Sequence, residues 1–128
     1  MKSTTKDWLT AAEDDLIASG ILAGDYRLTG LAIFHCQQCL EKCFKAVLEE
    51  KDELSIRSHD LLRLRLLANV DLSEDESRLL AIINEVYTDA RYPGDLGLLP
   101  HGKPSTFEIE EFIKFSRAIF QRVKDYLT

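Results

Sequence analysis

The longest uninterrupted stretch of the chain, from Leu31 to Tyr92, contains neither glycine nor proline. These two residues break helices more often than any others, so a stretch without them favours helices over strands. Three glycines precede the stretch, and three prolines and three further glycines follow it between Pro93 and Pro104. The sequence therefore predicts a helical protein with one long irregular segment, at residues 91–104, before its last helix.

Apolar residues recur every three or four positions in five segments, which is the spacing of a buried helix face. The first three helices are expected over about residues 5–22, 27–50 and 59–69. The fourth and fifth are expected to begin at Ser73 and Ser105, because each serine is followed three residues later by a glutamate, as in a capping box. We predict an all-α, five-helix, up-and-down domain that resembles a four-helix bundle, with four of the helices long.

Length and charge limit the kinds of protein this can be. A chain of 128 residues fits one domain, so residues 1–128 are expected to form a single helical domain. Its formal net charge of −6 argues against duplex DNA as a partner, because neutralising phosphates needs a basic face. No apolar run approaches the roughly 20 residues that cross a bilayer, and the first residues lack the apolar core of a secretion signal. We expect a cytoplasmic protein with no membrane contact.

Cysteines and acids on the first two expected helices raise the question of a metal site. Cys36, Cys39 and Cys43 are spaced as in some metal sites, but structural zinc takes four ligands and no second Cys or His pair of suitable spacing follows. These cysteines share a helix face with apolar residues, where free cysteine packs as a small hydrophobe. The acids of residues 13–15 are expected to face water. We predict a cysteine-containing core, with no metal and no cofactor.

A polar stripe follows the second expected helix. His35, Gln38, Lys42 and Lys45 lie at positions i, i+3, i+7 and i+10, which places them on one helix face. It is the one local basic surface in an acidic chain, and it could hold phosphate oxygens. The alternative is a solvated face with a Glu41–Lys45 pair worth a few tenths of a kcal/mol. Spacing alone favours this second interpretation.

Other candidate residues lie near the expected helix ends. His59 is expected in the first turn of the third helix, where it can act as an acid or base or simply join two helices by a hydrogen bond. Pro93 ends the fourth helix and places Arg91 and Tyr92 in its last turn. Arginine there interacts with the helix C-terminus or binds phosphate. His101 lies in the irregular segment and is expected to be exposed.

Taken in order, several motifs resemble the HEPN family of small helical domains, whose name refers to nucleotide binding in higher eukaryotes and prokaryotes. The resemblance covers nearly the whole chain. The motifs are Trp8-x-x-x-Ala12-x-x-Asp15-Leu16, Gly24-Asp25-Tyr26, Phe34-x-x-Gln37-Gln38-x-x-Glu41-Lys42-x-x-Lys45-Ala46, Ser58-His59-Asp60-Leu61, and Tyr87 with Arg91-Tyr92-Pro93.

The resemblance implies a bundle that commonly forms homodimers and is often encoded beside a small nucleotidyltransferase. Some members are ribonuclease toxins, and others are thought to bind nucleotides or to serve as adaptors. Because of the resemblance, we favour the interpretation that the polar stripe binds phosphate, with Gln37 or Glu41 orienting its side chains. The candidates for a nucleotide- or phosphate-binding cleft become Gln38, Lys42, Lys45, His59, Arg91 and Tyr92.

The ribonuclease branch of the family carries an arginine followed by histidine after four to six residues. Here nine residues separate Arg91 from His101, and one separates Arg57 from His59. We therefore expect a module that binds a nucleotide or short single-stranded RNA and acts with a nucleotidyltransferase, as in a toxin–antitoxin pair. One alternative is a metal-independent ribonuclease that uses Arg91 with His59 or His101. The other is a structural homodimeric adaptor without a ligand.

The amount of apolar surface predicts self-association. The fifth expected helix is apolar at nearly every third or fourth position through Leu127, and the second is apolar on two sides. One small bundle need not bury all of this surface, and an exposed remainder is typical of a partner site. We expect a homodimer.

Overall fold

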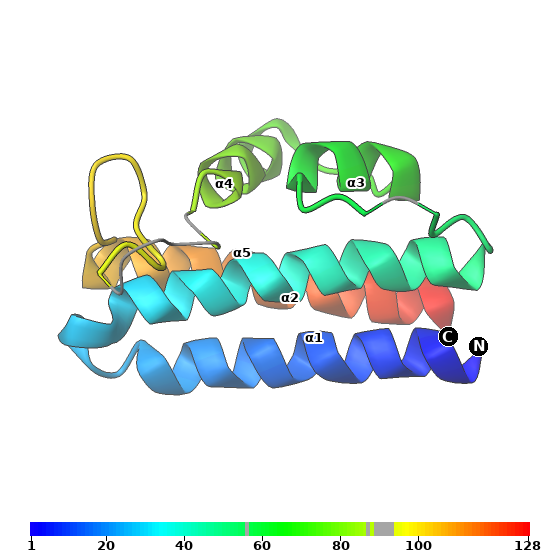
Figure 1. Cartoon of the computed structure of the whole chain (residues 1–128), viewed down its shortest axis with the longest axis horizontal. Helices are drawn as coiled ribbons and strands as arrows, with labels where there is room; N and C mark the ends of the chain where they lie inside the picture. The colour runs from blue at the N-terminus through cyan, green and yellow to red at the C-terminus, as the bar shows by residue number, and fades with distance from the viewer. Residues whose placement is uncertain (56, 87, 89–93) are drawn as a thin grey trace.

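In the computed structural model, the residues whose structure is described form five α-helices, which make up the bundle drawn in Figure 1. The structure describes residues 1–55, 57–86, 88 and 94–128. In chain order the helices are α1 (Ser3–Leu22), α2 (Thr29–Glu50), α3 (Leu61–Ala68), α4 (Glu74–Asn84) and α5 (Thr106–Leu127), and a 3-10 turn, η1 (Tyr26–Leu28), precedes α2. The described residues contain no strand, so the predicted all-α, five-helix fold is confirmed.

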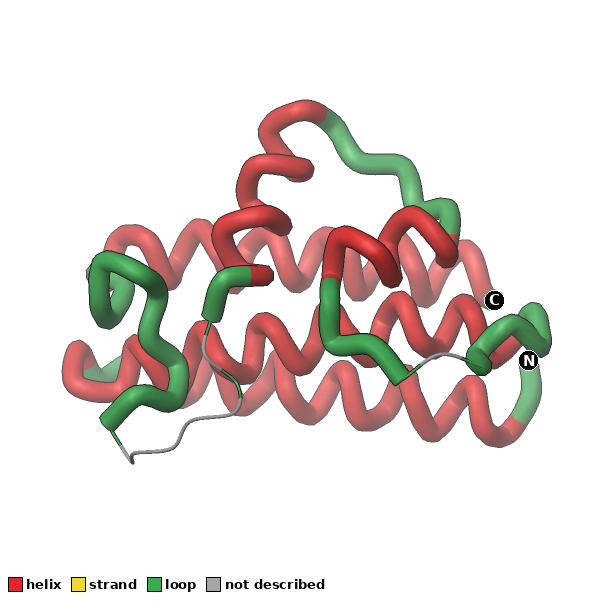
Figure 2. Tube along the Cα trace, turned by 45° about the horizontal axis from the view of Figure 1, so that its top comes forward, coloured by secondary structure: helices red, strands yellow, loops and turns green. Residues whose placement is uncertain are grey.

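Three long helices lie side by side, and two short helices pack across them (Figures 1 and 2). Helix α2 is central, because it packs against all four other helices. Helix α1 runs antiparallel to α2, whereas α5 runs parallel to it, since the segment containing α3 and α4 returns the chain to the end where α2 begins (Figure 1). The two short helices thus take the place of one long helix of a four-helix bundle.

The core forms around α2, where the apolar faces of the helices meet, and it includes buried residues of all five helices. Cys36, Cys39 and Cys43 are fully buried on α2, so their predicted core packing is confirmed. Burial raises the pKa of the Cys36 thiol to about 12, and this thiol therefore stays protonated. Within the described residues, no group of three or more His, Cys, Asp or Glu side chains could hold a metal ion. No helix in this part of the chain is long and apolar enough to span a membrane.

Both predicted capping boxes are present, but α4 is shorter than expected. The side-chain hydroxyls of Ser73 and Ser105 accept the backbone N–H groups of Glu76 and Glu108. In return, the side chain of each glutamate accepts the backbone N–H of its serine.

Helix α4 ends at Asn84. The backbone N–H groups of Glu85 and Val86 donate to carbonyl oxygens three residues back, rather than four as in an α-helix. This tightening ends the helix well before Pro93, where the sequence placed its end. Arg91 and Tyr92, expected in its last turn, lie outside the described residues.

The irregular segment packs on the start of α2. Gly97 has a φ of +80°, and its backbone lies against that of Gly30. Leu99 is buried, and the Thr29 hydroxyl donates a hydrogen bond to the carbonyl oxygen of Pro104 at 2.7 Å. The described part of the segment, residues 94–104, is therefore a docked element rather than a free loop.

Candidate functional site

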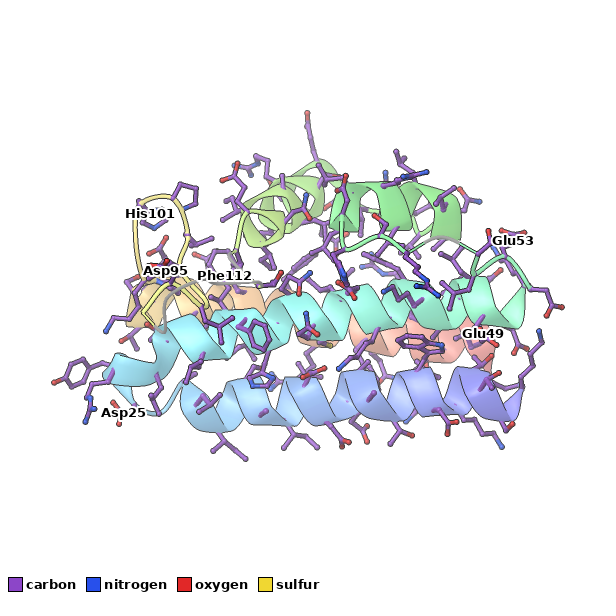
Figure 3. The ribbon with its side chains drawn as sticks, in the orientation of Figure 1. Asp25, Glu49, Glu53, Asp95, His101 and Phe112 are labelled. Carbon is purple, nitrogen blue, oxygen red and sulfur yellow. The ribbon has the colours of Figure 1, made fainter. Side chains whose placement is uncertain are left out.

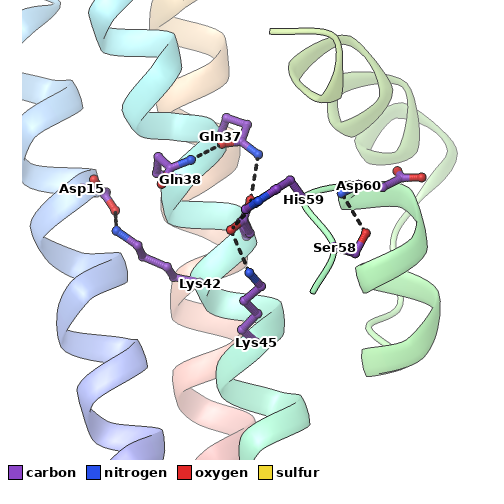
Figure 4. Close-up of polar contacts among 9 residues, drawn as sticks. Asp15, Gln37, Gln38, Lys42, Lys45, Ser58, His59 and Asp60 are labelled. Carbon is purple, nitrogen blue, oxygen red and sulfur yellow. Dashed lines mark hydrogen bonds and ion pairs between the residues drawn. The ribbon is translucent and has the colours of Figure 1, made fainter. Parts of the chain in front are cut away.

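The two lysines of the polar stripe on α2 bind two different carboxylates, so the stripe forms two separate polar clusters (Figure 4). Lys42 reaches across to α1, where its Nζ donates to Asp15 at 2.6 Å. The same carboxylate lies 2.8 Å from Nδ1 of His35. Lys45 points along α2 and donates to Glu41 at 2.9 Å. Both lysines are thus paired, so the stripe is not the free basic surface that the sequence predicted, whereas the expected Glu41–Lys45 pair is present.

Asp15 lies on the buried face of α1. We expected the acids of residues 13–15 to face water, which holds for Glu13 and Asp14 but is wrong for Asp15. Helical periodicity explains the difference, because Asp15 follows Ala12 by three positions and precedes Ser19 by four, and both are buried. Its partners on α2 compensate for its burial.

Glu41 is the centre of the second polar cluster. Its side chain is 7% exposed and accepts hydrogen bonds from Lys45 and, at 3.2 Å, from Nε2 of Gln37. Its two oxygens lie 3.0 and 3.1 Å from Nδ1 of His59. Burial acts to raise the pKa of this carboxyl, but the hydrogen bonds from Lys45, His59 and Gln37 outweigh it and leave the pKa lowered. Glu41 is therefore an ionised, largely buried acceptor that fixes side chains from two segments.

His59 precedes α3 rather than lying in its first turn. The N-cap of α3 is Asp60, whose side chain accepts the backbone N–H of Leu62 at 3.0 Å. The Ser58 hydroxyl accepts the backbone N–H of Asp60 at 3.1 Å. The His59 ring is 76% exposed, and Glu41 holds its Nδ1. Within the part of the chain that the structure describes, the other ring nitrogen has no hydrogen-bond partner.

An open cavity of about 510 Å³ lies beside His59. Its lining comes from α1, α2 and the connection after α2: Trp8, Lys45, Leu54, Ser55, Arg57 and His59. The Lys45 ammonium lies 5.7 Å from the centre of the Trp8 ring, close enough for a cation–π contact. Arg57 is exposed, and its charge has no ion-pair partner among the described residues. We call this the Trp8 cavity.

A second cavity, of about 350 Å³, lies between α2, α3 and α5 but offers less for a charged ligand. Its Arg122 is already bound twice to Glu76 and once to the carbonyl oxygen of Asp71. Its Lys51 lies over the ring of Tyr126, just as Lys45 lies over Trp8, so the two cavities differ in their arginines. Because Arg57 has no ion-pair partner among the described residues, the Trp8 cavity is the better candidate site.

Of the predicted site residues, the structure brings Lys45 and His59 together. Gln38 donates to Gln37 at 2.6 Å, and neither Gln38 nor Lys42 lines the Trp8 cavity. His101 lies 3.6 Å from Glu108, and Figure 3 shows it at the opposite end of the molecule from Glu53, which precedes the cavity-lining segment.

Sequence reasoning missed four lining residues, and Trp8 and Arg57 are the two that matter most for a nucleotide. Trp8 has the helical spacing of a core residue, although it also belongs to the motif by which the chain resembles the HEPN family. Arg57 stands two positions before His59, and this proximity was its only sequence signal. The structure adds both residues to the candidate site.

Comparisons with known proteins agree with this fold. The chain is similar to an archaeal HEPN homologue, ST0689, with 24% identity, a TM-score of 0.71 and complete coverage of both chains. It is equally similar to TT1696 from Thermus thermophilus, with 24% identity, a TM-score of 0.71 and coverage of 97% of this chain and 98% of the other. No curated protein matches. The model of the HEPN domain matches residues 5–126, and the chain therefore belongs to the HEPN domain family.

Proposed function

We propose that this protein binds a nucleotide or an RNA phosphate in the Trp8 cavity. The observation that supports this is the convergence of Lys45, Arg57 and His59 on one cavity. Guanidinium and ammonium groups are the side chains that most often bind phosphate, and an imidazole adds a further donor. The family to which the chain belongs supports the same ligand class.

The small positive charge of the Trp8 cavity limits the size of the anionic ligand that can bind there. Lys45 and Arg57 contribute two positive charges, and the adjoining Glu41 removes one, which leaves a net charge of +1 with His59 neutral. The whole chain carries −6, so an extended polyanion meets repulsion beyond the cavity. The proposed ligand is therefore small, either a mononucleotide or the end of a short single strand.

Replacing Arg57 with alanine is expected to weaken nucleotide binding about tenfold or more, because a charge-assisted hydrogen bond is worth roughly 1.5–3 kcal/mol. Isothermal titration of AMP against the wild type and Arg57→Ala measures this. Arg63→Ala is the matched control, since Arg63 is also exposed, lies on nearby α3 and does not line the cavity. Equal losses in the two variants would show only a general effect of charge and would contradict the proposed site.

A ribonuclease is the second candidate, because Arg57 and His59 line the same cavity. In such an enzyme, a histidine takes the proton of the 2′-hydroxyl and an arginine stabilises the charge that develops on phosphate. Metal-independent RNA cleavage that is lost in both Arg57→Ala and His59→Ala would favour it. Binding without cleavage would favour the module, and binding of nothing would leave only a structural adaptor.

We also propose that a small nucleotidyltransferase is a partner, in a toxin–antitoxin-like pair. This proposal rests on the family. Its test is whether a neighbouring gene encodes such an enzyme and whether the two purified proteins form a complex of defined stoichiometry.

The homodimer is proposed through α3. Most of the apolar face of α5 is buried within the chain. This helix therefore does not provide the exposed apolar surface from which we predicted a homodimer. Three leucines of α3 remain exposed instead, Leu62, Leu66 and Leu67, and Leu66 is 68% exposed. Exposed apolar clusters of this kind are typical of protein interfaces.

Sedimentation equilibrium at micromolar concentration is expected to give twice the chain mass of 14.6 kDa. Leu66→Glu should return the mass to that of one chain, because it places a charge in the proposed contact. Ile21→Glu on α1 is the control, since Ile21 is equally apolar and 73% exposed but lies on another face. A wild-type mass of 14.6 kDa would count against the dimer.

A further inference from the structure

Trp8 occupies an unusual position for the only tryptophan of the chain. Part of its side chain packs against the hydrophobic core, and part lines the Trp8 cavity. The Lys45 ammonium is held between the indole ring, at 5.7 Å from the ring centre, and the Glu41 carboxylate, at 2.9 Å. An aromatic surface thus stands beside the cationic groups, in the same cavity.

We propose that Trp8 is the platform on which the base of the ligand stacks, while the ligand phosphate lies against Arg57 and His59. This inference rests on the proposed function and narrows it. Aromatic side chains bind bases by stacking, and this contact accepts any base because each has a π face. Packing against the core holds the indole in place, which lowers the entropy lost when a base stacks on it.

Size and charge favour one nucleotide with one phosphate group. A volume of about 510 Å³ lies within the range of small-ligand sites. The net charge of +1 from Lys45, Arg57 and the adjoining Glu41 favours a ligand with one phosphate group over a ligand with several. The ligand class is therefore a nucleoside monophosphate or the phosphorylated terminal nucleotide of a single strand, rather than inorganic phosphate or a sugar phosphate.

The test compares ligands that share a phosphate and differ in the base. AMP and ribose 5-phosphate are titrated by calorimetry, and Trp8 fluorescence is followed in parallel, because no other tryptophan contributes. We expect AMP to quench Trp8 and to bind roughly ten- to a hundredfold more tightly than ribose 5-phosphate. A short RNA with a 5′-phosphate distinguishes a free nucleotide from a strand end. If this RNA binds more tightly than AMP, the site is assigned to a strand end.

Two variants separate stacking from folding. Trp8→Leu should bind AMP and ribose 5-phosphate equally, whereas Trp8→Phe keeps an aromatic ring and should retain most of the preference for AMP. Circular dichroism checks that both variants fold, which matters because Trp8 also contacts the core. Should wild-type protein bind AMP and ribose 5-phosphate equally, the base platform is wrong and phosphate binding stands. Should neither ligand bind, both proposals fail.

Discussion

Gly97→Ala is expected to lower the free energy of unfolding by roughly 2–4 kcal/mol. Gly97 has a φ of +80°, a conformation that side chains with a Cβ atom rarely adopt. A Cβ atom at this position would also overlap the carbonyl oxygen of Gly30 on α2. That oxygen belongs to the helix backbone and cannot rotate away, so the segment around Gly97 must detach from α2 to accept the new methyl group.

Gly30→Ala, at the residue that Gly97 contacts, is the control. A Cβ atom at Gly30 would lie 3.4 Å from the carbonyl oxygen of Gly97, which is an ordinary contact. Because Gly30 lies in α2 and alanine favours helices by up to about 1 kcal/mol, Gly30→Ala should be neutral or slightly stabilising. Urea unfolding followed by circular dichroism measures both. Wild-type stability of Gly97→Ala would show that the segment does not dock on α2 in solution.

The helices could be predicted from the sequence because their signals are local. Apolar spacing and the absence of glycine and proline marked five helices, and the serine and glutamate of each capping box fixed where α4 and α5 begin. The end of α4 carries no such signal, since no glycine or proline follows Asn84 until Pro93. The helix ends there by tightening its last hydrogen bonds, which periodicity does not show.

The candidate site was only partly predictable, because its contacts join distant segments. The Glu41–Lys45 pair follows from a spacing of four residues on one helix. The Lys42–Asp15 pair joins α2 to α1, across 27 residues, and no local pattern indicates it. Spacing placed both lysines on one stripe, but each turns to a different carboxylate, and only Lys45 reaches the Trp8 cavity.

Glu41→Leu is expected to lower the free energy of unfolding by about 3 kcal/mol at neutral pH. The substitution removes the acceptor shared by Lys45, Gln37 and His59 and leaves the Lys45 ammonium unpaired and largely buried. Loss of one partner from a buried pair costs about 3–5 kcal/mol. The lower end applies here, since Lys45 lines an open cavity and can turn toward water. Chemical denaturation at pH 7 measures the change.

Glu41→Gln tests whether the charge of Glu41, rather than its shape, holds this cluster together. The folded-state pKa of Glu41 lies below its ordinary value of 4.5, so ionised Glu41 stabilises the fold at neutral pH. This contribution is fully present above the unfolded-state pKa and is lost as the pH falls through the lower folded-state pKa. Wild type should therefore be more stable than Glu41→Gln at pH 7, and the difference should shrink as the pH drops below about 4.5, where protonated glutamate and glutamine become alike. A difference that stays constant from pH 7 to pH 3 would mean that the carboxylate charge does not hold Lys45 and His59 at the cavity.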